Sequence, residues 1–227
     1  MHLGHNNPAH EYQMRGVKLE TTKEERDLGV IMTQSLKPGA QCAKAARTAT
    51  VVLNQLARSF HVRDRHVFIQ LYKQYVRPHL EFAGPAWAPW TAADKEALEK
   101  VQKKAVRMVS GLAGHEYEER LKELEMTTLE ERRHQTDMVT VYKILTGKDD
   151  LDPEEWFEMV AAAPRATRVA ADPLNVRVRH GRLEVRKHFF SVRVTDQWNK
   201  VPGDIKRLKS PASFKAAYAR HRLISPP

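Results

Sequence analysis

The chain has 227 residues, of which 41% are hydrophobic and 29% are charged, and its formal net charge is +10 at pH 7. This length is sufficient for one or two compact domains with their own cores. No apolar run approaches the ~18 residues that a membrane span requires, and the start of the chain lacks the basic and apolar regions of a signal peptide. We therefore expect an intracellular protein, in the nucleus or cytoplasm.

The positive charge is concentrated after Pro164. Residues 1–163 hold 23 Lys and Arg against 24 Asp and Glu, whereas residues 164–227 hold 15 against 4, which gives net charges of −1 and +11. Neutralising phosphates requires many cations on one surface and releases counterions, so this asymmetry suggests a nucleic acid or an anionic membrane surface as partner. A basic tail that only keeps the chain soluble is the simpler alternative.

The first 37 residues are predicted to form a small β element. Residues 11–14 and 17–19 flank Arg15-Gly16, which is typical of a short hairpin, and residues 27–32 are predicted as a third strand. From Pro38 onward the apolar residues recur at helical spacing.

Asp64 is the predicted N-cap of the second helix, and Pro78 is predicted to end that helix because it lacks an N–H donor. Residues 81–90 are then predicted as a loop. The loop is too aromatic for a bare linker, so we expect its aromatic side chains to fill a core, with base stacking as the alternative. These side chains are Phe82, Trp87 and Trp90.

Thr91 is the predicted N-cap of the next helix, which has an apolar face from Leu98 onward. Its other face carries cations at helical spacing, which either follow a phosphate backbone or form an ordinary solvated surface. These cations are Lys100, Lys103, Lys104 and Arg107.

Two more helices are predicted, over residues 116–125 and from about Thr128 to Gly147. Asp149, Asp150 and Asp152 follow and precede Pro153, so a helix cap is favoured over a metal site. Residues 161–173 are small and irregular and are predicted to separate the near-neutral part of the chain from the basic part.

The basic part is predicted to begin with a second hairpin. Residues 176–178 and 183–185 alternate apolar residues with arginines around His180-Gly181, and a helix is expected from about Arg186. The candidate phosphate-binding residues of this part are Arg177, Arg179, Arg182, Arg186, Lys187 and Arg193.

No catalytic signature is complete. The chain has no phosphate loop, no GxSxG elbow and no CxxC pair. Cys42 lies among alanines, which favours packing over nucleophilic chemistry, and His2, His5 and His10 lack partners of fixed geometry for a metal. We predict no catalytic residue, no metal site and no cofactor.

Several sequence blocks nevertheless occur in an informative order. They are DLGV at 27–30, LYK and VRPHLE within 71–81, LEKVQKKA at 98–105, YEERL at 117–121, YKIL at 142–145, RKHFFSVR at 186–193, WNKVP at 198–202 and SFK at 213–215. In this order the blocks resemble the C-terminal part of reverse transcriptases of non-LTR retrotransposons of the jockey and chicken-repeat type. The resemblance covers nearly the whole chain.

The resemblance implies a mainly α fold in three segments. Residues 1–37 would be the last strands of a palm, with Leu28, Gly29 and Val30 in a primer-grip-like hairpin. Residues 38–163 would be a thumb-like helical bundle, and residues 164–227 a basic nucleic-acid-binding segment of helix and hairpin. The expected partners are RNA, an RNA–DNA hybrid or a DNA duplex, together with the palm and fingers of a longer parent polymerase.

The catalytic aspartates of such polymerases lie in an aromatic-Ala-Asp-Asp turn, and this chain contains no such tetrapeptide. Phosphoryl transfer by two metal ions needs positioned carboxylates, so the resemblance implies a chain that is inactive as a polymerase by itself. The alternative is a host-retained helical scaffold that binds a protein through the aromatic loop at residues 82–90. A membrane-surface protein that uses its basic tail is a third hypothesis.

Overall fold

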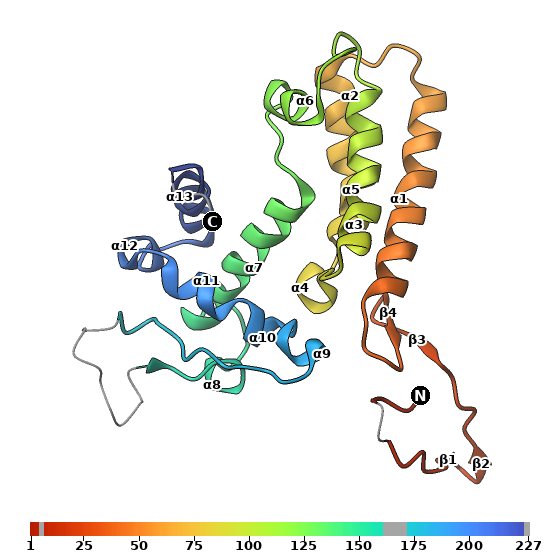
Figure 1. The fold of residues 1–227 in the computed structure, drawn as a ribbon, viewed down its shortest axis with the longest axis vertical. Coiled ribbons are helices and arrows are strands. Elements are labelled where there is room, and N and C mark those ends of the chain that lie inside the picture. The colour runs from red at the N-terminus through yellow and green to blue at the C-terminus, as the bar shows by residue number, and fades with distance from the viewer. Residues whose placement is uncertain (5–6, 161–171, 225–227) are drawn as a thin grey trace. The chain divides into compact units, whose positions relative to one another are not determined.

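The computed structural model describes residues 1–4, 7–160 and 172–224 (Figure 1). The chain divides into two compact units, Met1–Glu130 and Glu131–Pro227. The described fold is mainly helical, as the sequence predicted, and it has two small antiparallel hairpins near the N-terminus where one hairpin was predicted. The three-segment division of the chain at residues 37 and 163 stays a prediction.

The first hairpin pairs β1 (Gln13–Met14) with β2 (Val17–Lys18), and its turn is the predicted Arg15-Gly16. The second hairpin pairs β3 (Glu24–Asp27) with β4 (Val30–Thr33). The single strand predicted over residues 27–32 is therefore wrong. Asp27 pairs with Val30, so the two residues between them form a tight turn that reverses the chain.

Helix α1 (Gly39–Ser59) buries its small residues, including Cys42, Ala45 and Ala49. The next helix, α2 (Arg65–Leu71), begins at the predicted cap. The Asp64 side chain accepts hydrogen bonds from the backbone N–H groups of His66 and Val67, at 2.8 and 3.3 Å, which confirms this prediction.

The helix does not end before Pro78, and that prediction is wrong. It continues through a π-helical turn, η1 (Tyr72–Val76), into α3 (Arg77–Glu81). The N–H of Arg77 donates to the carbonyl of Tyr72, five residues back. This wider turn places Pro78 in the first turn of α3, where a missing N–H donor breaks no hydrogen bond.

The segment predicted as an aromatic loop contains one helical turn, α4 (Gly84–Trp87). Trp87 is only 5% exposed and donates its indole N–H to the carbonyl of Phe82 at 2.7 Å. The packing interpretation is thus confirmed for Trp87. Trp90 is half-buried, whereas Phe82 is 56% exposed.

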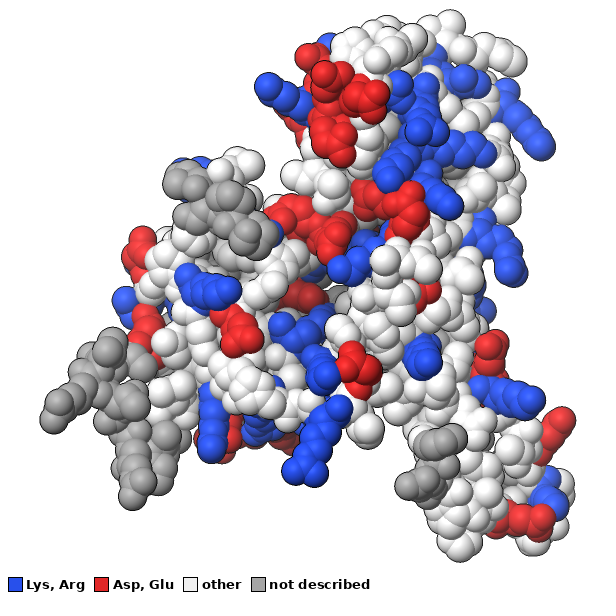
Figure 2. All heavy atoms as spheres, viewed as in Figure 1, with Lys and Arg blue, Asp and Glu red and all other residues white. Residues whose placement is uncertain are grey.

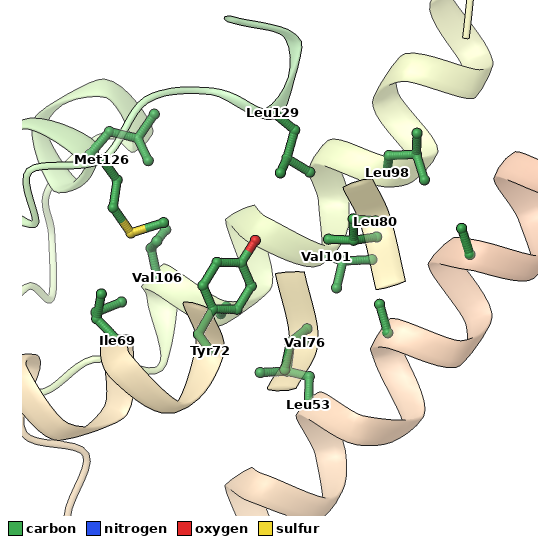
Figure 3. Close-up of a cluster of buried hydrophobic side chains, with 14 of the residues drawn as sticks. Leu53, Ile69, Tyr72, Val76, Leu80, Leu98, Val101, Val106, Met126 and Leu129 are labelled. Atoms are coloured by element: carbon green, nitrogen blue, oxygen red, sulfur yellow. The ribbon is translucent and has the colours of Figure 1, made fainter. Parts of the chain in front are cut away.

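Helix α5 (Ala92–Arg107) starts at the predicted cap, because Thr91 Oγ1 accepts from the N–H of Asp94 at 3.1 Å. Helix α6 (Tyr117–Glu123) follows. Side chains from α1, α2, η1, α3 and α5 form most of the core of the first unit, and residues of β4, α4, α6 and the segment up to Leu129 complete it; Figure 3 shows it in close-up. Its labelled members are Leu53, Ile69, Tyr72, Val76, Leu80, Leu98, Val101, Val106, Met126 and Leu129.

A buried polar network crosses this core at Glu99 and Gln102 of α5. Glu99 accepts hydrogen bonds from the N–H of Leu129 (3.1 and 3.2 Å), from the Tyr117 hydroxyl and from Gln102 Nε2 (3.3 Å). Gln102 also accepts from the Tyr72 hydroxyl at 2.9 Å. The network joins α5 to α6 and to the start of α7 (Leu129–Leu145).

The second unit contains most of α7 and a series of short helices. Asp152 caps the first of them by accepting from the N–H of Glu154 at 3.0 Å, which confirms the cap interpretation of this carboxylate. The helices are α8 (Pro153–Trp156), α9 (Glu184–Lys187), α10 (Phe190–Arg193), α11 (Thr195–Lys200), α12 (Gly203–Lys206) and α13 (Pro211–Ile224).

The core of this unit draws on both sides of residue 163. Met138 and Tyr142 of α7 belong to the same hydrophobic cluster as Trp198 of α11 and Phe214 of α13. The rings of Tyr142 and Phe214 stack at 4.5 Å. Residues 161–171, which include most of the predicted boundary segment, lie outside the described residues.

The hairpin predicted around His180-Gly181 is not formed, so this prediction is wrong. Val176 makes an isolated antiparallel bridge with Met159 instead, and residues 184–187 are helical. The alternating pattern had suggested two strands that pair with each other. Its first strand in fact finds its partner in the chain segment just after α8.

Candidate nucleic-acid interface

Helix α5 carries three exposed cations, Lys100, Lys104 and Arg107. Lys100 and Lys104 border an open groove of about 450 Å³, which is lined by α5 and by Thr50 of α1. Lys104 Nζ donates to the neutral Asn54 Oδ1 of α1 at 2.7 Å. None of the three cations has an acidic partner among the ion pairs of the described residues.

Lys103 differs from the other predicted cations of this helix. Its ammonium group lies 3.0 Å from both carboxylate oxygens of Glu96 and 5.5 Å from the centroid of the Tyr117 ring. It is half-buried. The charge of Lys103 is therefore balanced locally, and this residue contributes little to the open surface.

Helix α1 adds two exposed cations that sequence reasoning missed, Arg47 and Arg58. They recur with Thr50 and Asn54 at helical spacing, so these four residues share the face of α1 that borders α5. Figure 2 shows Lys and Arg atoms gathered over α5 and along α1. The same spacing was readable in the sequence, but it identifies a shared surface only once the two helices are known to be neighbours.

The predicted cations of the basic tail are largely paired. Arg177 Nη1 lies 2.7 Å from Glu158, and Arg179 Nη2 lies 3.9 Å from the same carboxylate. Lys187 pairs with Glu184, and this hydrogen bond lowers the pKa of the Glu184 carboxyl. These pairs reduce the charge that a phosphate would meet.

Arg193 is half-buried in the second unit. Its guanidinium donates to both carboxylate oxygens of Asp137, at 2.9 and 3.2 Å, and to the carbonyl of His188 at 3.2 Å. Burial raises the pKa of the Asp137 carboxyl, an effect that Arg193 opposes. The geometry is that of a structural ion pair between α7 and α10.

Arg182 and Arg186 are exposed, and Arg186 lies 5.0 Å from the centroid of the Phe189 ring. Sequence reasoning missed further exposed cations in this unit because they follow no single pattern. They are Lys148, Lys200, Arg207, Lys209, Lys215 and Arg220, of which Arg207 pairs with Asp172.

The charge asymmetry is smaller in the folded chain than along the sequence. The second unit, 131–227, includes the acidic residues of 149–158. It holds 19 Lys and Arg against 12 Asp and Glu, a net charge of +7. The first unit, 1–130, holds 19 against 16, which leaves +3. The tail is thus partly neutralised by residues that precede Pro164 in the same unit.

The residues predicted as primer-grip-like form the tip of the β3–β4 hairpin. Leu28 is 91% exposed, and Val30 is buried in the core of the first unit. The Gly29 carbonyl accepts from Lys44 Nζ at 2.9 Å. The tip also lies against Phe82, because a Cβ atom on Gly29 would come within 3.2 Å of that ring.

No group of three or more His, Cys, Asp or Glu side chains gathers in a metal-binding arrangement within residues 1–4, 7–160 and 172–224. His5 lies outside these ranges. Cys42 is buried in the core of the first unit. None of the helices in the described part of the chain combines the length and apolar character needed to cross a membrane.

Comparisons with protein-family models, with curated proteins and with solved structures give no match to this chain. The cationic surfaces and the ordered sequence blocks therefore carry the functional argument.

Proposed function

We propose that the chain binds nucleic acid through one cationic surface of its first unit, here named the α1–α5 face. The observation that carries this proposal is the group of exposed cations on two neighbouring helices, none of which pairs with a carboxylate among the described ion pairs. Unpaired cations on one surface release counterions when they meet phosphates. The face consists of Arg47, Arg58, Lys100, Lys104 and Arg107.

The spacing on α5 suits a phosphate backbone. Lys100 and Arg107 are seven residues apart, roughly 10 Å along the helix axis. Phosphates of one strand recur about every 3.4 Å along a duplex axis, so this face spans about three of them. Lysine and arginine contacts to phosphates position a duplex without reading its sequence, which is what holding a template and primer requires.

We further propose that the chain is the thumb-like C-terminal part of a non-LTR retrotransposon reverse transcriptase, as the ordered blocks imply. In this role it holds RNA, an RNA–DNA hybrid or a DNA duplex and does not extend a primer alone. The test is to incubate the purified chain with a primer–template, dNTPs and Mg²⁺. DNA synthesis above that of a mock purification would overturn this proposal.

The α1–α5 face is tested by salt-dependent binding to a short duplex. The triple variant K100Q/K104Q/R107Q should bind more weakly and should lower the slope of log K against log salt by about 2 to 3, since each phosphate contact contributes about 0.9. A matched control removes the same charge from exposed lysines elsewhere in the unit, as K23Q/K37Q/K122Q. Equal slopes for the two triple variants would refute the assignment of this face.

The aromatic loop offers less support for a protein-binding scaffold. Such a role needs exposed anchor residues, and Trp87 is buried and Trp90 half-buried. Phe82 is the aromatic side chain of this loop that is exposed.

A further inference from the structure

Three flat side chains are arranged together on the surface of the second unit. The Phe189 ring lies parallel to that of Trp156, with an angle of 2° and a centroid distance of 6.4 Å. The Arg186 guanidinium carbon lies 5.0 Å from the Phe189 centroid. We name Trp156, Phe189 and Arg186 the aromatic stack.

The stack is fixed from the inside and open on the outside. Buried Phe190 packs edge-on against the Trp156 ring, with ring centroids 6.0 Å apart. It also packs edge-on against Phe157, with ring centroids 6.2 Å apart. Phe189 precedes Phe190 in the chain but is 45% exposed. Of two consecutive phenylalanines, one therefore completes the core, and the other presents its ring to solvent.

The segment that precedes Phe189 presents apolar and cationic side chains to solvent. Leu183 is 74% exposed, and Arg182 beside it is exposed and has no ion-pair partner among the described residues. The carboxylate of this segment, Glu184, is paired with Lys187 and lies 3.6 Å from His188. A planar anionic ligand would meet no unpaired carboxylate from this segment.

We propose that the aromatic stack binds an unpaired base of single-stranded nucleic acid, with Arg182 on the adjoining phosphate. Aromatic rings and arginine planes are the groups on which proteins stack splayed bases, and such stacking tolerates any base because each has a π face. A lipid surface would need a wider apolar area, and an aliphatic peptide would gain nothing from the guanidinium plane. This site deepens the proposed function and rests on it, since it adds a single-strand site to a duplex-binding chain.

The proposal is tested on the full chain with two labelled probes, a single strand of about 12 thymidines and a duplex of about 12 base pairs, in anisotropy titrations. F189L keeps an apolar side chain but loses the plane, and R186Q loses the guanidinium. Each should weaken single-strand binding about tenfold and leave duplex binding unchanged. Y75L removes an aromatic ring of similar exposure from the first unit and serves as the matched control.

A direct readout is the fluorescence of a single strand that contains 2-aminopurine, which stacking quenches. We expect quenching with the wild type and with Y75L, and a loss of quenching with F189L, whose circular dichroism should match the wild type. Wild-type affinity and quenching in F189L would overturn the proposal. The proposal would also be overturned if the wild type bound phosphatidylserine vesicles but no single strand, and if F189L lost only the vesicle binding.

The two proposals fail in different ways. If the triple variant of the α1–α5 face loses duplex binding while F189L behaves as wild type, the stack assignment is wrong and the duplex face stands. If F189L loses single-strand binding while the triple variant binds duplex normally, the α1–α5 face is wrong.

Discussion

Glu99 shows how much one buried side chain contributes to the first unit. Its carboxylate satisfies three donors at once, from Leu129, Tyr117 and Gln102, which belong to three different elements or their ends. A buried donor that loses its acceptor destabilises the fold by its full desolvation free energy. The network therefore fixes where α6 and the start of α7 lie against α5.

Replacing Glu99 with alanine should lower the free energy of unfolding by about 3 kcal/mol, because it leaves several buried donors without their acceptor. Tyr117→Phe removes only one hydroxyl and should cost about 1 kcal/mol. Urea denaturation followed by circular dichroism measures both values. Glu123→Ala, at an exposed position of α6, is the control and should change the free energy by less than about 0.5 kcal/mol. A similar small change for Glu99→Ala would contradict the role of the network.

Lys206 is a buried cation in the second unit, with 1% of its surface exposed. Its ammonium group donates to Asn175 Oδ1 at 2.6 Å and lies 5.1 Å from the Trp198 ring centroid. Burial lowers the pKa of Lys206 from 10.5. In the window between the folded pKa and 10.5, the unfolded chain binds a proton that the folded chain lacks, so stability rises with pH there and is lost as pH falls through the folded value.

The matching experiment compares the wild type with Lys206→Met, which keeps the length of the side chain without the charge. As the pH is raised from about 8 to about 10.5, the free energy of unfolding of the wild type should rise relative to that of Lys206→Met. Tyrosines titrate in both proteins, so the difference isolates the lysine. A flat difference for Lys206→Met would refute the shift.

At the scale of elements, the β3–β4 turn carries a residue that does not suit it. Leu28 and Gly29 have φ angles of 44° and 90°, the left-handed region at both positions of a two-residue turn. Asparagine and glycine occupy such positions at low cost, whereas a leucine is disfavoured by about 1 kcal/mol or more. Its side chain is almost fully exposed, so packing does not offset this strain.

Leu28→Asn should therefore stabilise the hairpin by about 1 kcal/mol, seen as slower amide exchange across β3 and β4. Gly29→Ala should act in the opposite direction, because its backbone conformation strains any side chain and the added Cβ would press on Phe82 at 3.2 Å. Faster exchange in Leu28→Asn would show that the leucine makes a stabilising contact.

Local signals made much of the fold predictable. The N-caps Asp64, Thr91 and Asp152 act on N–H groups two or three residues away, so their chemistry is legible without tertiary structure. The turn of the first hairpin is equally local. The continuation of the helix through Pro78 could not be predicted in this way, because it depends on a π-helical turn that shifts the hydrogen bonds by one residue.

The candidate site was less predictable, because the state of each cation depends on distant partners. Arg177 is balanced by a carboxylate 19 residues away, and Arg193 by one 56 residues away. A count of arginines along the sequence cannot separate these two from exposed Arg182. Lys100, Lys104 and Arg107 could be found from the sequence because the apolar face of their own helix fixes which side is exposed.

At the scale of the whole molecule, the two units have separate hydrophobic clusters. The first ends at Leu129 and the second begins at Met138, and no buried residue belongs to both among those described. Helix α7 runs across the boundary between the units. Cooperative unfolding follows shared cores, so the two units should lose structure in distinguishable steps.

Variants in each core can assign these steps. Glu99→Ala acts on the first unit, and Arg193→Ala acts on the second by removing the guanidinium that donates to both oxygens of the buried Asp137 carboxylate, a loss of about 3 kcal/mol. Hydrogen exchange read by mass spectrometry should show faster exchange confined to residues 1–130 in the first variant and to residues 131–227 in the second. Arg182→Ala, at an exposed position near Arg193 in the sequence, should change neither pattern. Faster exchange across both units in either variant would mean that α7 transmits unfolding from one core to the other and that the chain behaves as a single cooperative body.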